Sequence, residues 1–360
     1  MRRISIDMVR PGMILGKAIL GGNSQVLLNA NVEIKPQYVS YLKSLGIEHV
    51  YVKDSRIEDA LIKDVIKEET RQEARIMVKN IMQNIETPGE KPKSINVDDK
   101  ELLQTVATII EELIQNKDMV VQLSDIRAKS DYLFAHCVNC SVLATLVALK
   151  MHYNYVDLKH LVTGTMLLDL GMITVPENIV NKPGELTEDE RKTIQTHPLY
   201  GFEIFKKTQI FDARAGMVIL QHHERIQGQG YPNGLSGDKI HKSAQIVGIV
   251  DVYDALTSVR PFRKAFPPYR AIEMLMSWGG EYFNLEILQH FLSLVAAYPY
   301  GSHVFLSNGE SGLVIANNPG LTLRPVVRVL YQGRDLAPHH SPYDLDLSDS
   351  LDLTITDVLD

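Results

Sequence analysis

The sequence predicts a mainly α protein, in which a helical bundle is flanked by a small N-terminal α+β domain and a small C-terminal β-segment. Apolar residues recur at three- and four-residue spacings through most of residues 97–298, as in amphipathic helices. A polar Pro/Gly stretch, Thr87–Lys93, marks a boundary before this region. After Pro299, short β-rich runs alternate with Asn-Gly and Asn-Pro turn signals. The expected domains are 1–55, a connecting segment 56–96, the helical domain 97–298 and a β-rich segment 299–360.

The N-terminal domain is expected to contain a hairpin, a short helix and a further strand. Apolar stretches at Met13–Leu20 and Gln25–Leu28 flank a Gly-Gly-Asn turn signal. A helix is predicted over Gln37–Leu45, with Gly46 as its C-cap. The chain then returns as a strand over Ile47–Val52.

The segment from Arg56 to Ile85 also has a helical pattern, which indicates either a connecting helix or a dimerising helix. Within the helical domain, long apolar-striped segments predict further helices over Lys100–Asn116, Tyr132–Met151, Leu158–Asp169, Ala213–His222, Ser243–Thr257 and Asn284–Ala297. The acidic C-terminal stretch from Asp344 is expected to pack as an edge strand or to fray.

Composition limits the classes of function. The 360 residues suit two or three domains, and 45% hydrophobic with 22% charged residues is an ordinary globular composition. A net charge of −7 argues against a DNA or RNA partner. Neither an apolar run near the length of a membrane span nor a signal peptide is apparent, so a cytoplasmic protein is expected. Cys137 and Cys140 are expected to be small buried residues of a helix.

Six polar residues interrupt otherwise apolar helical patterns: His136, Asp169, His197, His222, His223 and Asp251. Any one of them has an ordinary structural explanation, such as a helix cap or a satisfied core histidine. Together, imidazole and carboxylate groups suit iron, manganese or zinc. A carboxylate can also bridge two ions about 4 Å apart for the hydrolysis of phosphate esters.

Four segments carry a more specific resemblance. LLDLGMITVPENIVNKPGELTEDE, HPLYGFEIF, HHERIQGQGYPNGLSGDKI and IVDVYDALTSVRPFRKA are similar, in order and spacing, to the HD-GYP family. That family consists of HD-type helical bundles, metal phosphohydrolases that hydrolyse cyclic di-GMP. The similarity runs from about Asp131 to Phe291. It implies cyclic di-GMP or a related cyclic dinucleotide as the ligand and iron or manganese as the cofactor.

The resemblance also implies roles for individual residues. The first metal would be held by His136 and Asp251, with Asp169 as the catalytic carboxylate that bridges to a second ion. The second site would be completed by His197, His222 and His223. The GYP loop would be Gly230, Tyr231 and Pro232, and the phosphates would face Arg260, Arg263 and Lys264, because guanidinium groups bind phosphate bidentately.

The pattern departs from the family at several positions. Leu168 stands where the family has the histidine of its His-Asp pair, Met172 replaces a lysine, and Gln227 replaces an aspartate. Cys137 replaces a serine, and Tyr132 stands where three-metal members place a glutamate. Leucine cannot ligate a metal, and the loss of a cation weakens the stabilisation of phosphate charge. The second-metal set is complete, so its occupancy is favoured.

Three hypotheses follow. The first is a degenerate HD-GYP protein that binds metal, and with it cyclic di-GMP, but hydrolyses it weakly or not at all. The second is an active phosphodiesterase in which water replaces the missing imidazole and Arg260 and Arg263 supply the cationic help. The third is a non-catalytic dimeric scaffold in which Arg56–Ile85 is the contact helix.

Overall fold

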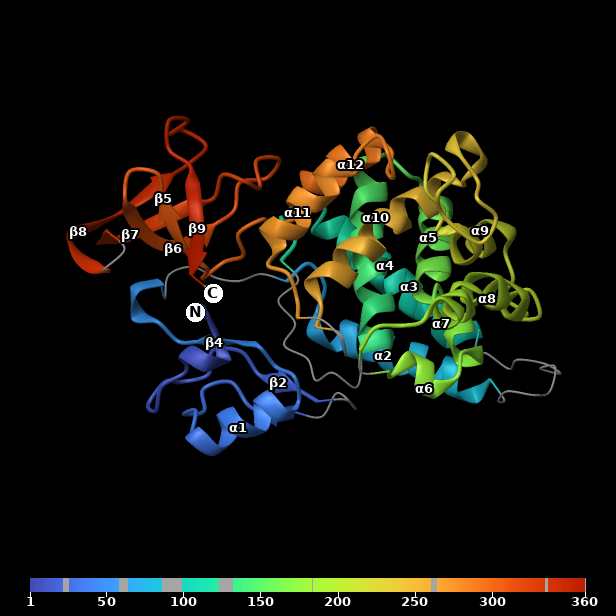
Figure 1. The fold of residues 1–360 in the computed structure, drawn as a ribbon, viewed down its shortest axis with the longest axis horizontal. Helices are drawn as coiled ribbons and strands as arrows, with labels where there is room; N and C mark the ends of the chain where they lie inside the picture. The colour runs from blue at the N-terminus through green and yellow to red at the C-terminus, as the bar shows by residue number, and fades with distance from the viewer. Residues whose placement is uncertain are drawn as a thin grey trace. The chain divides into compact units, whose positions relative to one another are not determined.

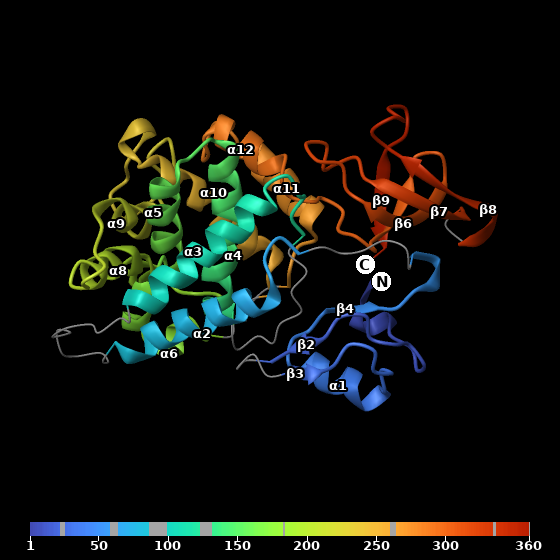
Figure 2. The same cartoon turned by 180° about the vertical axis from the view of Figure 1, so that it is seen from behind.

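The computed structural model describes residues 1–21, 26–57, 64–85, 99–122, 132–182, 184–259, 264–333 and 336–359. The chain divides into two compact units. The helical unit consists of residues 65–117 and 132–292, and the β-rich unit consists of residues 1–64, 118–131 and 293–360. Figures 1 and 2 show the elements of each unit from opposite sides.

The helical unit contains these elements in chain order: α2 (Glu68–Asn84), α3 (Asp99–Gln115), α4 (Tyr132–Lys150), α5 (Tyr155–Met166), the 3₁₀ turn η4 (Leu170–Thr174), α6 (Glu177–Val180), α7 (Glu188–Gln195), α8 (His197–Phe205), α9 (Ala213–Gln221), the 3₁₀ turn η5 (Gly237–Lys239), α10 (Lys242–Thr257), α11 (Pro268–Ser277) and α12 (Leu285–Leu292). The predicted helices are therefore present, with ends that differ by a few residues. The longest discrepancy is in the segment predicted from Arg56 to Ile85, whose helix begins only at Glu68. The last helix ends at Leu292 rather than Ala297.

Helix α4 is the central element of this unit. It packs against α2, α3, α5, α10 and α12, and every residue from Ala135 to Ala148 is buried. Contrary to the expectation from sequence, α4 is long and apolar enough to meet the length and hydropathy of a membrane span. Its most apolar stretch is 78% buried inside the unit, as in the core helix of a globular domain. Cys137 and Cys140 are buried on this helix as free thiols, as predicted.

Helix α2 lies inside the helical unit, which differs from the expected connecting segment 56–96. It packs against α3 and α4 and buries residues from Thr70 to Met82 along one face. The Thr70 hydroxyl donates to Glu112 Oε1 at 2.8 Å, and the backbone N–H of Lys67 donates to Glu112 Oε2 at 2.7 Å. These polar contacts fix the start of α2 on α3.

The β-rich unit contains β1 (Arg2–Ser5), η1 (Ile6–Met8), β2 (Ile19–Leu20), β3 (Val26–Leu28), α1 (Pro36–Ser44), β4 (His49–Val52), η2 (Ser55–Ile57), β5 (His303–Leu306), β6 (Glu310–Ala316), β7 (Val326–Gln332), β8 (Ala337–Asp346) and β9 (Ile355–Leu359). β2 and β3 form the predicted hairpin, and α1 ends before Gly46, whose φ of 78° suits a C-cap glycine. Strand β4 pairs antiparallel with β1, a strand that the sequence analysis did not identify.

The C-terminal strands form one five-stranded antiparallel sheet in the order β8-β7-β6-β5-β9. Strand β9, from the acidic tail, pairs with β5 at the edge, so the predicted edge strand is present. Residues from both ends of the chain meet in this unit. The backbone N–H of Arg3 donates to the carbonyl of Gly301 at 3.2 Å, and the Tyr300 hydroxyl donates to the carbonyl of Ile57 at 2.8 Å.

Candidate metal centre

The six predicted metal ligands come together in the helical unit. His136 lies on α4, Asp169 follows α5 as the residue before η4, and His197 begins α8. His222 and His223 follow the end of α9, and Asp251 lies in the middle of α10. Five of these side chains are buried and His223 is half-buried. A polar group of this kind is retained in a core only when its partners compensate for its desolvation.

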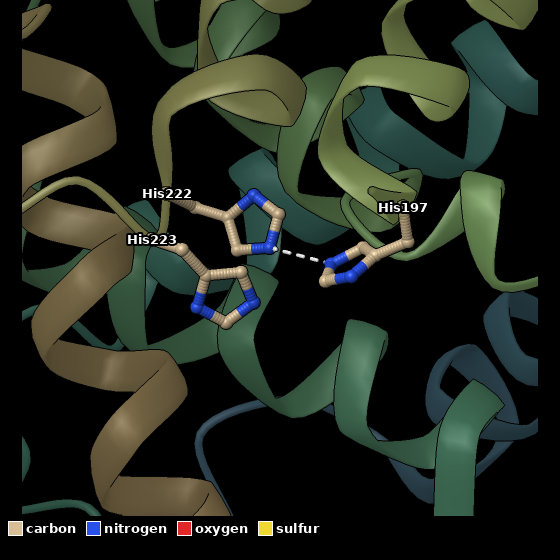
Figure 3. Close-up of side chains that lie close together, drawn as sticks. All are labelled: His197, His222 and His223. Atoms are coloured by element: carbon tan, nitrogen blue, oxygen red, sulfur yellow. Dashed lines mark hydrogen bonds between the residues drawn. The ribbon is translucent and has the colours of Figure 1, made fainter. Parts of the chain in front are cut away.

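Three of the histidines form a compact donor group. One ring nitrogen from each of His197, His222 and His223 lies within 4.8 Å of the others, and Figure 3 shows the rings converging from two sides. The Nδ1 atoms of His197 and His222 each lie 2.8 Å from a backbone carbonyl, those of Ile194 and Ile219. Nδ1–H donation to these carbonyls leaves each Nε2 as a lone-pair donor, and the two Nε2 atoms lie 3.4 Å apart.

The carboxylate of Asp169 lies between this histidine group and a second set of donors, His136 and Asp251. Its Oδ1 is 3.3 Å from Nε2 of His197, and its Oδ2 is 3.9 Å from Nε2 of His136. Nε2 of His136 is also 3.1 Å from Oδ1 of Asp251. Asp169 therefore has one oxygen facing each set, which is the placement that a bridging ligand needs.

A second carboxylate, which the sequence analysis missed, orients His136. Nδ1 of His136 donates to Oδ2 of Asp254 at 2.7 Å, and Asp254 Oδ1 accepts from the Asn139 amide at 2.6 Å. Asp254 is one helical turn after Asp251 on α10 and is almost fully buried. A carboxylate on the far nitrogen of a ligand histidine fixes its tautomer and ring orientation. The i, i+3 spacing of two aspartates in an apolar helix was the available signal.

The electrostatics keep most of these groups in ligating form. Burial lowers the pKa of His197 and of His222 to about 4, and it holds the pKa of His223 well below its usual value. The pKa of Asp251 is lowered, because the surrounding imidazoles outweigh the burial that would raise it. Burial alone would also lower the pKa of His136, but nearby Cys140, Tyr132, Asp251 and Asp254 raise it well above the usual value. Metal binding at His136 must therefore displace a proton, whereas the other imidazoles are already neutral.

The positions that depart from the family are also defined in the structure. Leu168 is fully buried and supplies no donor atom. Met172 is half-buried in η4, and its backbone N–H donates to the carbonyl of Asp169 at 2.8 Å. The Tyr132 ring stacks on His136, with its hydroxyl 3.4 Å from Nδ1. Gln227 is exposed and donates from Nε2 to the carbonyl of Gly280 at 3.1 Å.

The Gly230-Tyr231-Pro232 loop lies against His223. The Tyr231 ring stacks on the His223 imidazole with centroids 4.6 Å apart, and the Tyr231 N–H donates to the carbonyl of His223 at 3.2 Å. A β-carbon at Gly230 would lie 2.4 Å from that same carbonyl oxygen, so only glycine fits.

Glu224, also missed from the sequence, clamps the loop. Its two carboxylate oxygens accept the backbone N–H groups of Asn233 at 2.8 Å and Leu235 at 2.9 Å. Of the predicted phosphate-facing residues, Lys264 is exposed, and Arg260 and Arg263 lie outside the described residues.

Comparisons with known proteins identify the family of the chain. A family model described as an HD domain matches residues 109–287, and one described as a KOW domain associated with an HD domain matches residues 303–360. The chain therefore belongs to the HD-domain family. Its HHERIQGQGYP segment resembles the HD-GYP branch of that family.

Curated relatives match about two thirds of the chain. A cyclic di-GMP phosphodiesterase of Pseudomonas aeruginosa is 32% identical over 235 residues, which is 65% of this chain and 56% of the relative. A cyclic di-GMP phosphodiesterase response regulator of Xanthomonas campestris is 28% identical over 65% of this chain and 61% of its own length. The chain thus spans little more than half the length of these relatives. Among solved structures, an HD-GYP-type protein of Bdellovibrio bacteriovorus aligns with a TM-score of 0.48 and 16% identity, covering 80% of this chain and 97% of that one.

Proposed function

We propose that this protein binds a divalent metal ion, iron or manganese, and a cyclic dinucleotide such as cyclic di-GMP, and that it hydrolyses the dinucleotide weakly or not at all. The observation that carries the proposal is the contrast between the two donor sets. The set of His197, His222, His223 and Asp169 is complete, whereas the set around His136 has a buried leucine where an imidazole donor belongs.

The complete set supports occupancy by one ion. Three neutral imidazoles and one carboxylate are ligands that suit iron, manganese or zinc. Carbonyls of Ile194 and Ile219 already orient two of the imidazoles, so little reorganisation is needed when the ion binds. Bound there, the ion would supply Lewis-acid stabilisation of a phosphate oxygen.

The incomplete set supports impaired hydrolysis. His136, Asp251 and Asp169 offer one imidazole and two carboxylates, and the pKa of His136 is raised, so a proton competes with metal there. Met172 cannot neutralise charge on a phosphate in the way that a lysine would. Loss of one such electrostatic group costs on the order of 100-fold or more in rate.

Cyclic dinucleotide binding is supported by the relatives and by the loop beside the metal centre. The curated relatives act on cyclic di-GMP, and a related Vibrio cholerae enzyme, 34% identical over 41% of this chain, is named as specific for 3′3′-cGAMP. In this chain, the ring of Tyr231 lies against His223, and Glu224 accepts backbone N–H groups from Asn233 and Leu235, which follow it in the loop. A stacked aromatic next to a metal-ligating histidine offers a surface for a base or a sugar.

The test combines metal analysis with a turnover assay. The purified full chain would be loaded anaerobically with Fe²⁺, or with Mn²⁺ in parallel, and incubated with cyclic di-GMP while the linear dinucleotide and GMP are followed by chromatography. We expect about one ion per chain and little or no product. Chain that retains no metal would overturn the proposal, as would rapid turnover that is lost in Asp169→Ala.

The second candidate is an active phosphodiesterase with an altered first site. It is favoured by one observation, namely that His136 Nε2 already lies 3.1 Å from Asp251 and 3.9 Å from Asp169. Three protein ligands can hold a catalytic metal that keeps an open position. Two bound ions per chain together with turnover that requires Asp169 would establish this function instead.

A further inference from the structure

We infer that Arg71, on helix α2, is a positioning residue of the metal centre, which acts on the ligand His136 through Asn139 and Asp254. The inference deepens the proposed function, since it concerns a ligand of the proposed metal site. Arg71 lies outside the segment that matches the HD-domain family, which begins at residue 109. Helix α2 would therefore complete the site from outside the matched domain.

The geometry is a continuous chain of hydrogen bonds. Arg71 Nη1 donates to Asn139 Oδ1 at 3.3 Å, and Asn139 Nδ2 donates to Asp254 Oδ1 at 2.6 Å. Asp254 Oδ2 accepts from His136 Nδ1 at 2.7 Å, which leaves His136 Nε2 facing Asp251 and Asp169. Each contact determines the orientation of the next group.

These hydrogen bonds contribute strongly to stability because the four residues that form them are buried. Arg71, Asn139, Asp254 and His136 are between 1% and 3% exposed. Buried polar groups that lose a partner are costly, and a network in low dielectric is stabilised by having every member satisfied. Arg71 also faces Glu68, with Nε 3.7 Å from Oε2, and Ser258 Oγ lies 3.4 Å from Asp254 Oδ2.

The main effect of Arg71 is to fix the orientation of the Asn139 side-chain amide. A carboxamide can turn over and exchange its donor and acceptor ends. Because Arg71 is a pure donor, it holds Oδ1 toward itself and Nδ2 toward Asp254. Replacing the guanidinium removes this donor from Oδ1, which weakens the preference for the amide orientation that donates to Asp254 beneath His136.

The first test uses the metal-free chain, so it does not depend on metal binding. Full-length protein labelled with ¹⁵N-histidine would be examined by NMR, with the His136 nitrogen signals assigned by their loss in His136→Gln. We expect the hydrogen-bonded Nδ1 signal of His136 to shift toward that of an unconstrained imidazole in Arg71→Met and to be largely restored in Arg71→Lys. An unchanged His136 signal in Arg71→Met would overturn the inference.

Thr70→Val is the matched control. It removes the neighbouring buried hydrogen bond from α2 to Glu112 on α3 and leaves the Arg71 contacts intact. We expect the His136 signals of this variant to match the wild type. If Thr70→Val shifts them as Arg71→Met does, general loosening of α2 is the cause and the inference fails. Should Arg71→Met not fold, Arg71→Gln is the substitute, with the same expected shift.

The second readout is the affinity for Mn²⁺ added alone, measured by equilibrium binding. Loss of an outer partner of a metal ligand typically costs 10–100-fold in affinity. We expect Arg71→Met to weaken by about 10-fold the binding of a second Mn²⁺ ion, at high concentration, to the incomplete set around His136. The first ion, at His197, His222 and His223, should bind as in the wild type. Wild-type chain that binds no Mn²⁺ or Fe²⁺ would overturn the proposed function, while the NMR comparison would still decide the role of Arg71.

Discussion

The backbones of Gly171 and His197 touch: a β-carbon at Gly171 would lie 2.0 Å from the carbonyl oxygen of His197 and 2.6 Å from the backbone nitrogen of Gly201. This close approach packs η4 against the first turn of α8. It brings Asp169, two residues before Gly171, within reach of His197. The short distance between the Asp169 carboxylate and the His197 imidazole therefore depends on the absence of a side chain at Gly171.

Gly171→Ala is expected to separate η4 from α8 and to weaken metal binding at the second set by at least about 10-fold, because both ligands lie beside the clash. Affinity for Mn²⁺ and the melting temperature would be measured. Gly279→Ala is the control, since its β-carbon would meet the side-chain tips of Leu285 and Leu288, which can move. Unchanged affinity in Gly171→Ala would contradict the prediction.

Restoring the family residues should restore the first site. In Leu168→His with Met172→Lys, we expect a second ion per chain and an increase in cyclic di-GMP hydrolysis of about 10-fold or more. The metal-free variant should be less stable by about 1–3 kcal/mol, because the new imidazole is buried without its metal. Leu168→Met, with Met172→Lys, keeps the apolar volume and should not gain the second ion. A double variant that gains neither metal nor turnover would show that Leu168 is not the cause of weak activity.

The two donor sets should differ in their response to pH. Because the pKa values of His197 and His222 lie near 4 in the metal-free protein, protons compete with metal there only as pH falls toward 4. The pKa of His136 is raised, so metal binding to its set should strengthen as pH rises through neutrality. Titrations with Mn²⁺ from pH 8 to pH 5.5 should show one nearly constant affinity. If the affinity of the tightest site falls steadily as pH is lowered over this range, the occupied site is not the set of His197, His222, His223 and Asp169.

The same histidines should make the metal-free fold sensitive to acid. A histidine with an ordinary pKa near 6.5 when unfolded and about 4 when folded binds its proton first in the unfolded state. Stability from burying the neutral ring is thus fully present above about pH 6.5 and is lost as pH falls toward 4. The melting temperature of metal-free protein should fall over this window, and His197→Gln should reduce the slope. An equal slope in the two proteins would argue against the lowered pKa.

Removal of the Glu224 clamp should loosen the loop that carries Tyr231. Glu224→Ala loses two charge-assisted hydrogen bonds from backbone N–H groups, each of which contributes about 1.5–3 kcal/mol. Hydrogen exchange at Asn233 and Leu235 should accelerate by about 10-fold or more. Glu203→Ala, which changes an exposed residue of α8, serves as the control. Protection that persists in Glu224→Ala would show that the loop is held by other contacts.

The helical domain and the candidate metal ligands were predicted from the same kind of pattern. Long segments such as α4 and α10 have clear apolar periodicity, so polar residues within them stand out. His136 and Asp251 were found in this way, and the family motifs supplied the pairing between distant segments. Asp254 and Asn139 were missed because their role depends on which helix faces which, and a single sequence pattern does not encode that.

The boundaries of the two units were harder to predict. The sequence analysis assigned residues 56–96, which include α2, to a connecting segment, yet the buried face of α2, including Arg71, belongs to the helical unit. Strand β1 is only four residues long and pairs with β4, which lies more than forty residues later. Contacts of this range leave no local signal. The β-rich unit illustrates the same point, because Ile57 packs with Tyr300, Leu313 and Leu330 from the other end of the chain.

The joining of both chain ends in one unit has a consequence for biosynthesis. About 235 residues separate Ile57 from Ser293, where the C-terminal segment of the β-rich unit begins. At a translation rate of about 5–20 residues per second, the N-terminal strands wait on the order of 10–50 s for their C-terminal partners. During that interval the apolar surface of Ile57 has no cover from Tyr300. All of the helical unit has been synthesised before the C-terminal strands of the β-rich unit emerge. The order of the segments therefore favours folding of the helical unit first.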